Sequence, residues 1–213
     1  YLMKEYKLPI GCDVPETIIL ADGDFPSHPL ALEWLRQCLY VVCCDGAANT
    51  YIRSGRMPEA IVGDGDSLLP DIKERYASLI HSEAEQETND LSKAFRFCLS
   101  QERKRITIMG ATGKREDHTI GNVSLLADYM EQAEVSMMTD YGIFVPIRED
   151  SMFESYIGQQ ISVFNMNSTA LSAEGLAYPL SVFTNWWQGT LNEALARHFI
   201  IRTEGKVLVF RVF

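Results

Sequence analysis

The sequence of 213 residues lacks several features that would place it in a specialised class of protein. No apolar stretch approaches the roughly 20 residues that cross a bilayer as a helix, so we expect no membrane partner. The first twelve residues lack the charged and then apolar pattern of a secretory signal, which favours a cytoplasmic protein. There is no internal repeat and no low-complexity linker.

Basic residues are scarce as well. The chain has 19 Lys and Arg against 29 Asp and Glu, a formal net charge of −10. Nucleic-acid binding needs a basic surface that neutralises phosphates, so we expect no nucleic acid as a partner. An acidic protein can still bind a small polyphosphate if its carboxylates hold a divalent cation and the cation holds the phosphates.

The five cysteines form no CxxC pair and no His–Cys spacing typical of a metal site. Cys43 and Cys44 lie in an apolar run, and Cys98 lies on the apolar face of a predicted helix. We therefore expect buried, reduced thiols with neither a zinc-binding nor a catalytic role.

Up to about residue 140, predicted strands alternate with predicted helices. The strands are short runs rich in Ile and Val at residues 17–21, 40–44, 60–62, 105–109 and 135–138. The helices are predicted at residues 28–37, 47–54, 69–79, 89–100 and 118–131. In the last of these, the apolar face would consist of Ile120, Val123, Ala127 and Met130. Such alternation is typical of an α/β fold with a mostly parallel sheet.

After residue 140 the pattern changes to short strands alone, predicted at residues 142–147, 160–164, 170–173, 199–202 and 207–212. Turn residues separate them, and no long amphipathic helix is present. We therefore expect two domains, an α/β domain over residues 1–140 and a small antiparallel β domain over residues 141–213.

Acidic residues recur just after predicted strands or at the starts of predicted helices. They are Asp22, Asp24, Asp45, Asp64, Asp66, Asp90 and Asp117. Ligands of an open parallel sheet bind at the carboxyl ends of its strands, so several of these carboxylates should meet in one crevice, where a cation would relieve their repulsion. Any single Asp is equally typical of a turn or a helix N-cap. The repeated arrangement favours a functional cluster.

A glycine-rich segment at residues 110–118 leads from a predicted strand into a helix. Glycine lets the backbone approach a phosphate closely, and a helix N-terminus favours anions. Lys114 and Arg115 add positive charge. The spacing is neither that of a Walker A loop nor GxGxxG, and a glycine-rich turn capped by Asp117 is the alternative. His118 and Asn122, one helical turn apart, could face the same site.

A third segment covers residues 87–94. We expect Thr88 to cap the following helix, which places Asp90 in its first turn and Lys93 about one turn further on. A first-turn Asp also simply stabilises the helix dipole. The functional interpretation makes Asp90 a metal ligand or an acceptor-orienting carboxylate and Lys93 a phosphate contact.

Together these segments resemble the thiamine pyrophosphokinase family. The matching stretches are residues 21–26, 45–49, 63–67, 88–94 with a TxDxxKA pattern and 110–122 with a GxxGxRxDHxxxN pattern, in the family's order. Residues 175–180, 189–194 and 204–207 look similar as well. The resemblance implies a Rossmann-like nucleotide-binding catalytic domain over residues 1–140 and a thiamine-binding β-sandwich domain over residues 141–213. It also implies a homodimer with active sites between subunits.

The resemblance further implies transfer of the diphosphate of ATP to the hydroxyl of thiamine, giving thiamine diphosphate and AMP, with Mg²⁺ as cofactor. The residues implied as catalytic are Asp64, Asp66, Asp90 and Arg115, and the implied metal ligands are Asp45, Asp64, Asp66 and Asp90. The residues implied to bind ATP and its cation are Asp24, Asp45, Gly46, Ser67, Thr88, Lys93, Gly110, Thr112, Gly113, Lys114, Asp117, His118 and Asn122.

The residues expected to contact thiamine are Tyr178, Trp186, Trp187 and Asn192. Thiamine carries a permanent positive charge, which aromatic faces bind by cation–π contact. Core packing of the tryptophan pair between the two domains is the alternative.

The chain departs from the family pattern at three positions. Gly65 stands where the family usually has Phe, Lys114 where it has the second Gly of a pair, and Leu191 where it has Ser. Two other functions fit the same motifs. One is a pyrophosphokinase for another hydroxymethyl acceptor such as a pterin, and the other is a catalytically silent nucleotide-binding regulator.

Overall fold

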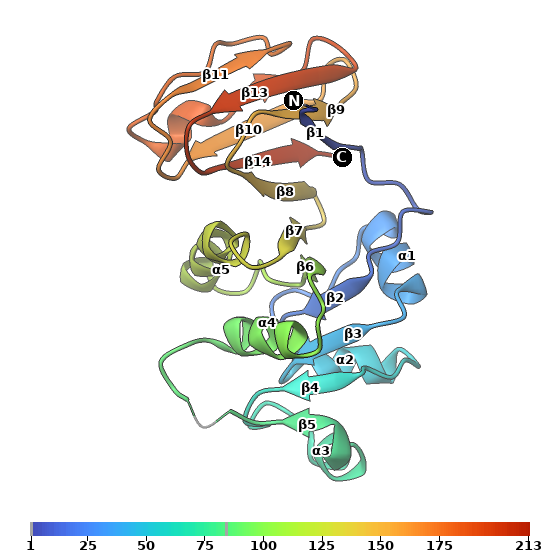
Figure 1. The fold of residues 1–213 in the computed structure, drawn as a ribbon. Coiled ribbons are helices and arrows are strands. Elements are labelled where there is room, and N and C mark those ends of the chain that lie inside the picture. The colour runs from blue at the N-terminus through green and yellow to red at the C-terminus, as the bar shows by residue number, and fades with distance from the viewer. Residues whose placement is uncertain (1, 84) are drawn as a thin grey trace. The chain divides into compact units, whose positions relative to one another are not determined.

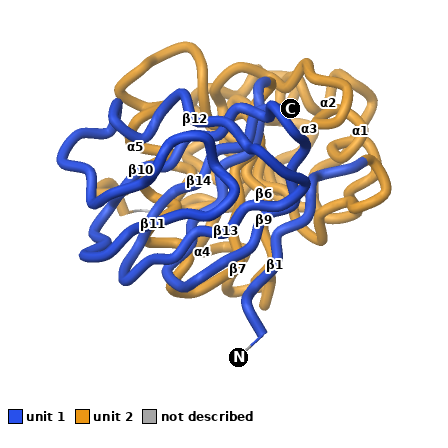
Figure 2. The backbone as a smooth tube through the Cα atoms, turned by 90° about the horizontal axis from the view of Figure 1, so that it is seen from above, with its two compact units in different colours: residues 1–10, 141–213 blue, residues 11–140 orange. Residues whose placement is uncertain are grey.

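Two compact units make up the protein, for which a computed structural model describes residues 2–83 and 85–213. One unit, drawn in orange in Figure 2 and called the first unit in the text, contains residues 11–140. The other, drawn in blue and called the second unit in the text, contains residues 141–213 with the N-terminal segment up to residue 10. The chain combines helices with two β-sheets, so the predicted mixed α/β class is confirmed.

The N-terminal segment belongs to the second unit because it supplies a strand there. Strand β1 (Lys4–Tyr6) pairs in parallel with β9 (Ser151–Glu154), with Lys4 opposite Ser151. The sequence pattern had placed these residues in the first domain. Pairing between segments so far apart in the chain leaves no local signal.

The first unit is built on parallel strands. They are β2 (Thr17–Leu20), β3 (Val41–Cys44), β4 (Ala60–Val62), β5 (Ile80–His81), β6 (Arg105–Met109) and β7 (Glu134–Met138), in the order β7-β6-β2-β3-β4-β5. All their pairs are parallel. The strands predicted for this part lie within a residue of these bounds, and only the two-residue β5 was not predicted.

Helices lie on both sides of this sheet. They are α1 (Pro29–Gln37), α2 (Ala47–Arg53), α3 (Pro70–Arg75), α4 (Asp90–Ser100) and α5 (Glu116–Tyr129), and a 3₁₀ turn, η1 (Ala77–Leu79), precedes β5. In Figure 1, α4 and α5 lie on one side of the strands, and α1 and α2 lie on the other. No helix among the described residues is long and apolar enough to cross a membrane.

Two local predictions about these helices, the Thr88 cap and the burial of Ile120, were wrong, and so was the alternative that Asp117 caps α5. Asn89, and not Thr88, caps α4, because its side-chain oxygen accepts a hydrogen bond from the Ser92 N–H at 2.9 Å. Helix α5 begins one residue before Asp117, after Arg115, so Asp117 is not its cap. Ile120 is 55% exposed, since the residues that α5 buries lie nearer its C-terminal end.

The chain changes direction across the sheet at β2, which has β3 on one side and β6 on the other. The loops that follow β2 and β6 therefore run side by side. The Gly23 N–H donates to Gly110 O at 2.7 Å, and the Asp24 N–H donates to Thr112 O at 2.9 Å. A β-carbon at Gly23 would come within 2.4 Å of Thr112 O, so this approach requires glycine. Such a reversal of strand order is where open α/β sheets form their ligand crevices.

The second unit contains mostly antiparallel strands. The order β12-β10-β14-β8 joins β12 (Asn192–Glu193), β10 (Gln160–Asn165), β14 (Val207–Val212) and β8 (Gly142–Ile147). The order β1-β9-β13-β11 joins the paired strands β1 and β9 to β13 (His198–Thr203) and β11 (Leu171–Glu174). A 3₁₀ turn, η2 (Trp186–Gly189), precedes β12. The stacked rings of Phe153 and Phe199 lie in its core.

Four of the five cysteines are buried and free, as predicted, but Cys12 is exposed. Burial raises the pKa of the Cys43 and Cys44 thiols, and that of Cys98 to about 12. These thiols stay protonated and unreactive at neutral pH.

Arg211 on β14 holds the N-terminal segment in the second unit. Its guanidinium is buried and donates to the backbone carbonyls of Tyr6 at 3.2 Å, Glu154 at 2.8 Å and Lys7 at 3.1 Å. The carboxylate of Glu154 accepts from the Leu8 N–H at 2.8 Å. Burial lowers the pKa of Arg211 to about 10. One side chain thus joins β14 to β9 and to the segment that follows β1.

Replacing Arg211 with Met should lower the free energy of unfolding by roughly 2–4 kcal/mol, because three backbone carbonyls lose a buried, charged donor. Urea unfolding followed by circular dichroism measures the change. Arg202→Met is the matched control, since Arg202 lies on the neighbouring sheet and forms exposed ion pairs with Glu174 and Asp150. Equal losses from the two substitutions would contradict the assigned role.

Candidate active site

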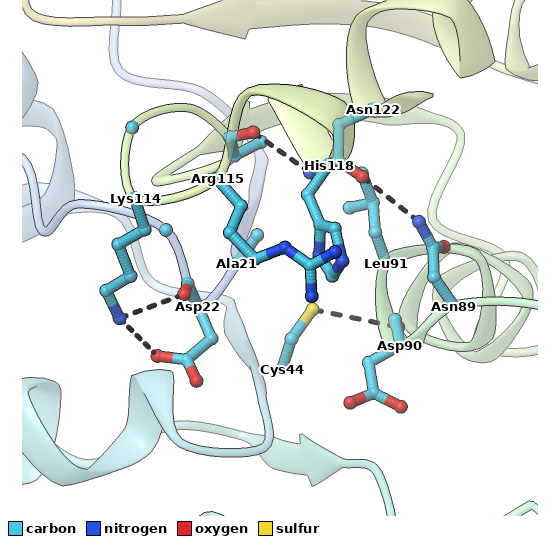
Figure 3. Close-up of a pocket in the computed structure, with 13 residues that line it drawn as sticks. Ala21, Asp22, Cys44, Asn89, Asp90, Leu91, Lys114, Arg115, His118 and Asn122 are labelled. Atoms are coloured by element: carbon cyan, nitrogen blue, oxygen red, sulfur yellow. Dashed lines mark hydrogen bonds and ion pairs between the residues drawn. The ribbon is translucent and has the colours of Figure 1, made fainter. Parts of the chain in front are cut away.

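A pocket of about 450 Å³ lies at the carboxyl ends of the parallel strands (Figure 3). The loops after β2 and β6, the end of β3, the start of α4 and the N-terminal half of α5 line it. Its volume is typical of a small-molecule site. The predicted site residues that it brings together are Asp90, Gly113, Lys114, Arg115, His118 and Asn122.

Lys114 links the two loops at one end of the pocket. Its ammonium donates to Asp22 O at 3.0 Å and to Asp22 Oδ1 at 3.3 Å, as Figure 3 shows. Gly113 and Lys114 both have left-handed backbones, with φ of 78° and 58°. A β-carbon at Gly113 would collide with the Asp24 carboxylate, at 2.1 Å from Oδ2. The turn therefore depends on Gly113, and it aims Lys114 at Asp22.

Arg115 adds a second cation, which lies beside the His118 ring in Figure 3. Its guanidinium donates to Asp117, with Nη2 2.6 Å from Oδ2. This hydrogen bond lowers the pKa of Asp117 and raises that of Arg115. Both side chains are exposed, so the ion pair is weak enough for an anionic ligand to compete for Arg115.

Asp90 provides acidic charge at the start of α4. Its carboxylate is half-exposed, and the buried ammonium of Lys93 lies 3.5 Å from its Oδ1. The thiol of Cys44 donates to the Asp90 carbonyl at 3.7 Å, so the end of β3 contacts the start of α4 (Figure 3). Lys93 therefore pairs with the Asp90 carboxylate from a buried position and does not line the pocket itself.

Asp45 is the buried member of the acidic residues. It follows β3 in a left-handed conformation with φ of 37° and is 5% exposed. Its Oδ2 accepts from the Ser67 N–H at 3.2 Å, while its buried Oδ1 has no hydrogen-bond partner among the described residues. Burial raises the pKa of Asp45, and the charges of Asp90 and Asp64 raise it further. These carboxylates are thus close enough to repel one another.

The other two acidic residues of this loop are bonded locally. Asp64 Oδ1 accepts from the Asp66 N–H at 3.0 Å, and the Asp66 side chain is 83% exposed, 4.0 Å from the Lys73 ammonium. Gly65 has φ of 77°, and a β-carbon there would lie 3.2 Å from Lys73 Cε. Lys73 therefore occupies the space beside Gly65, the position at which the family usually has Phe.

The acidic side chains, in their present positions, do not fully coordinate a divalent cation. No three His, Cys, Asp or Glu side chains converge to hold a metal ion within the described part of the chain. The unpartnered Asp45 Oδ1, acted on by the Asp90 and Asp64 charges, is nevertheless the kind of hard anionic donor that Mg²⁺ binds. The donor chemistry therefore fits a Mg²⁺ ion at Asp45.

Most of the remaining predicted residues lie outside the pocket lining. Thr88 is turned away, because its hydroxyl bonds Glu85 and accepts from Arg96. The predicted residues of the first unit that do not line the pocket are Asp24, Asp45, Gly46, Asp64, Asp66, Ser67, Thr88, Lys93, Gly110, Thr112 and Asp117.

The site prediction omitted several residues that do line the pocket. They are Ala21, Asp22, Gly23, Cys44, Asn89, Leu91 and Ala111. Asp22 carried a usable signal, since it directly follows a predicted strand as the chosen aspartates do. Asn89 carried another, because Asn is a favoured helix cap. Cys44 and Leu91 look like ordinary core residues in the sequence.

The residues expected to contact thiamine all lie in the second unit. The side chains of Tyr178, Trp186 and Trp187 are exposed. Asn192 is buried. Its Oδ1 accepts from the Tyr178 N–H at 3.1 Å, and its Nδ2 donates to the Tyr178 carbonyl at 2.9 Å. Leu191 is exposed and has a left-handed φ of 64°, which is uncommon for Leu.

Two family models match the chain. Residues 31–138 match the thiamin pyrophosphokinase catalytic domain, and residues 142–210 match the thiamin pyrophosphokinase substrate-binding domain. Thiamine pyrophosphokinase 2 of Arabidopsis thaliana is 31% identical over 155 residues, which cover 61% of this chain and 57% of that protein. Thiamine pyrophosphokinase 1 of Oryza sativa subsp. japonica is 30% identical over 129 residues, 49% of each chain. The chain thus spans about half the length of the curated relatives it matches.

Solved structures show the same fold. The yeast thiamin pyrophosphokinase superposes with a TM-score of 0.80 at 16% identity, covering 100% of this chain and 92% of that one. The enzyme from Candida albicans gives a TM-score of 0.77 at 17% identity, covering 99% and 93% of the two chains.

Mg²⁺ should raise the melting temperature of the wild type and raise that of Asp45→Asn much less, because an amide oxygen binds Mg²⁺ poorly. Without metal, Asp45→Asn should melt higher than the wild type at neutral pH, since it removes a buried, repelled charge. Differential scanning calorimetry with and without Mg²⁺ measures both effects. Asp71→Asn, the same change at the exposed start of α3, is the control and should respond to Mg²⁺ as the wild type does. An unchanged Mg²⁺ response in Asp45→Asn would contradict the assignment.

Proposed function

Because the chain belongs to the thiamin pyrophosphokinase family, we propose that it transfers the diphosphate group of ATP to the hydroxyl of thiamine, giving thiamine diphosphate and AMP. The observation that carries this proposal is the distribution of charge in the pocket. Lys114 and Arg115 lie on the loop after β6, and Asp90 lies at the start of α4. The family matches favour neither a pterin acceptor nor a silent regulator.

The cations of the pocket bind the phosphates. Arg115 is suited to bidentate contact with phosphate oxygens, and Lys114 contributes a point charge. Both are held in the free protein by aspartates, Arg115 by Asp117 and Lys114 by Asp22. A triphosphate with more charge than a single carboxylate would draw them away from these exposed partners. Gly113 and the start of α5 bring the backbone close to the same position.

Asp90 receives the proton. The thiamine oxygen forms a bond to the β-phosphorus of ATP, and the bond from that phosphorus to the α,β-bridging oxygen breaks, so AMP leaves with the bridging oxygen. The hydroxyl proton passes to the Asp90 carboxylate and then to solvent. Such a reaction depends chiefly on positioning and on neutralising charge. The buried Lys93, 3.5 Å away, holds the carboxylate in place.

Asp45, Asp64 and Asp90 would hold a Mg²⁺ ion, with Asp66 beside them. The Mg²⁺ ion would supply charge neutralisation of the phosphate oxygens. Asp45 contributes its unpartnered Oδ1. Asp64 and Asp90 already act on it electrostatically.

The second unit would bind thiamine. Its strands would form the β-sandwich that the family resemblance implies, and the first unit would be the Rossmann-like domain. Tyr178, Trp186 and Trp187 present exposed rings to the cationic thiazolium. A homodimer with active sites between subunits is part of the same proposal.

The reaction is tested by incubating the protein with Mg-ATP and thiamine and separating the products by chromatography. AMP and thiamine diphosphate should appear in equal amounts. ADP in place of AMP would mean transfer of the γ-phosphoryl group alone and would contradict the proposal. A pterin alcohol, supplied in parallel, should give no AMP above background.

Replacing Trp187 with Leu should raise the KM for thiamine between several-fold and about thirty-fold, since a desolvated cation–π contact contributes up to about 2 kcal/mol. The KM for ATP should change little. The melting temperature should also stay constant, because Trp187 is 73% exposed. Steady-state kinetics at saturating ATP give the KM for thiamine.

Tyr156→Leu removes another exposed ring of the same unit and serves as the control, with no expected effect on thiamine. The same measurement applies to Trp186→Leu and Tyr178→Leu. If all three aromatic substitutions leave the thiamine KM at its wild-type value, the acceptor binds elsewhere.

A further inference from the structure

Two asparagines form a bridge along one side of the pocket. The Nδ2 of Asn89 donates to Oδ1 of Asn122 at 3.0 Å, and the Nδ2 of Asn122 donates to the carbonyl of Ala111 at 2.9 Å (Figure 3). Asn89 also caps α4 through Ser92. The bridge therefore runs from the start of α4, across α5, to the loop after β6.

Two of the three segments that the bridge joins carry charged groups of the pocket. Helix α4 begins with Asp90, directly after Asn89. The loop after β6 carries Lys114 and Arg115, a few residues beyond Ala111. Two hydrogen bonds join side chains of α4 or its cap to side chains of α5, namely the one between Asn89 and Asn122 and one deeper contact.

That deeper contact involves Tyr129, near the C-terminal end of α5. Its hydroxyl lies 2.7 Å from Ser92 Oγ, and its ring stacks on Phe95 with a centroid distance of 4.0 Å. All three residues are buried. This packing fixes the bodies of the two helices against each other, so the asparagine bridge is left to set the local position of their pocket ends.

We infer that Asn89 and Asn122 are positioning residues that hold Asp90 at its working distance from Lys114 and Arg115. The inference rests on the proposed function, and it assigns Asn122 a different role from direct contact with ATP. Its Oδ1 and its Nδ2 are both bonded to the protein. In phosphoryl transfer, where catalysis depends on positioning, a displacement of about 1 Å can cost as much as about a hundredfold in rate.

The test compares Asn89→Ser with Tyr129→Phe. A serine still caps the helix through its hydroxyl oxygen, but it lacks the amide that reaches Asn122. Tyr129→Phe keeps the stacked ring and removes only the deeper hydrogen bond. For each variant and for the wild type, kcat and the KM values for ATP and thiamine are measured. The side-chain amide signals of Asn122 are recorded by ¹⁵N NMR.

We expect Asn89→Ser to lower kcat about tenfold and to leave the KM for ATP within about twofold, because the bridge orients groups and does not bind the nucleotide. The Asn122 amide signals should shift in the same variant. Tyr129→Phe should lower the melting temperature while kcat and the Asn122 signals stay near wild-type values. Asn122→Ala should lower kcat by a similar factor, and adding Asn89→Ser to it should lower kcat little further, since both changes break one bridge.

A wild-type kcat in Asn89→Ser, with shifted Asn122 signals, would overturn the positioning role. Unshifted signals would show that the bridge does not form in solution and would overturn it as well. A KM for ATP raised tenfold at constant kcat would make the asparagines ligand contacts. Failure of the wild type itself to release AMP is a separate outcome, because it contradicts the proposed function before any variant is compared.

Discussion

The pocket depends on one close approach of two backbones. The loops after β2 and β6 lie side by side because strand order reverses at β2, and hydrogen bonds from Gly23 and Asp24 to the other loop hold them there. Gly23 leaves no room for a β-carbon beside Thr112 O, and Gly113 leaves none beside the Asp24 carboxylate. With the loops held in this way, Lys114 reaches Asp22, and Arg115 directly precedes the helix that carries His118 and Asn122.

The electrostatics of this end of the sheet follow from what the loops bring together. Asp45 is buried with one unpartnered oxygen, and it experiences the charges of Asp90 and Asp64. Lys114 and Arg115 each pair with an exposed aspartate, and Lys93 pairs with Asp90. In the free protein, Asp45 thus keeps one oxygen without a hydrogen-bond partner among the described residues, while Lys114 and Arg115 pair only with exposed aspartates that a stronger anion can displace. That arrangement suits a ligand consisting of a polyphosphate and a divalent cation, since each component meets charge of the opposite sign.

The second unit contains aromatic side chains in two different settings. Its core contains aromatic rings such as Phe153 and Phe199, while Trp186 and Trp187 stay exposed on a short 3₁₀ turn. Arg211 closes this unit by bonding three backbone carbonyls, two of them in the N-terminal segment. A buried cation whose recorded hydrogen bonds all go to carbonyls is sensitive to truncation. The stability of this unit therefore depends on its N-terminal segment, which is far along the chain from residues 141–213.

Local patterns in the sequence specify the elements and the kind of chemistry. Ile- and Val-rich runs and helical spacing placed nearly every strand and helix of residues 11–140 to within a few residues, because these patterns report local burial. The positions of aspartates after strands indicated the pocket end of the sheet. Only the tertiary structure decided which side chains meet. It gave the cap of α4 to Asn89, turned Thr88 towards Arg96, exposed Trp187 and joined β1 to β9. These outcomes depend on contacts between residues distant in the chain, and such contacts leave no periodicity or spacing in the sequence to be read.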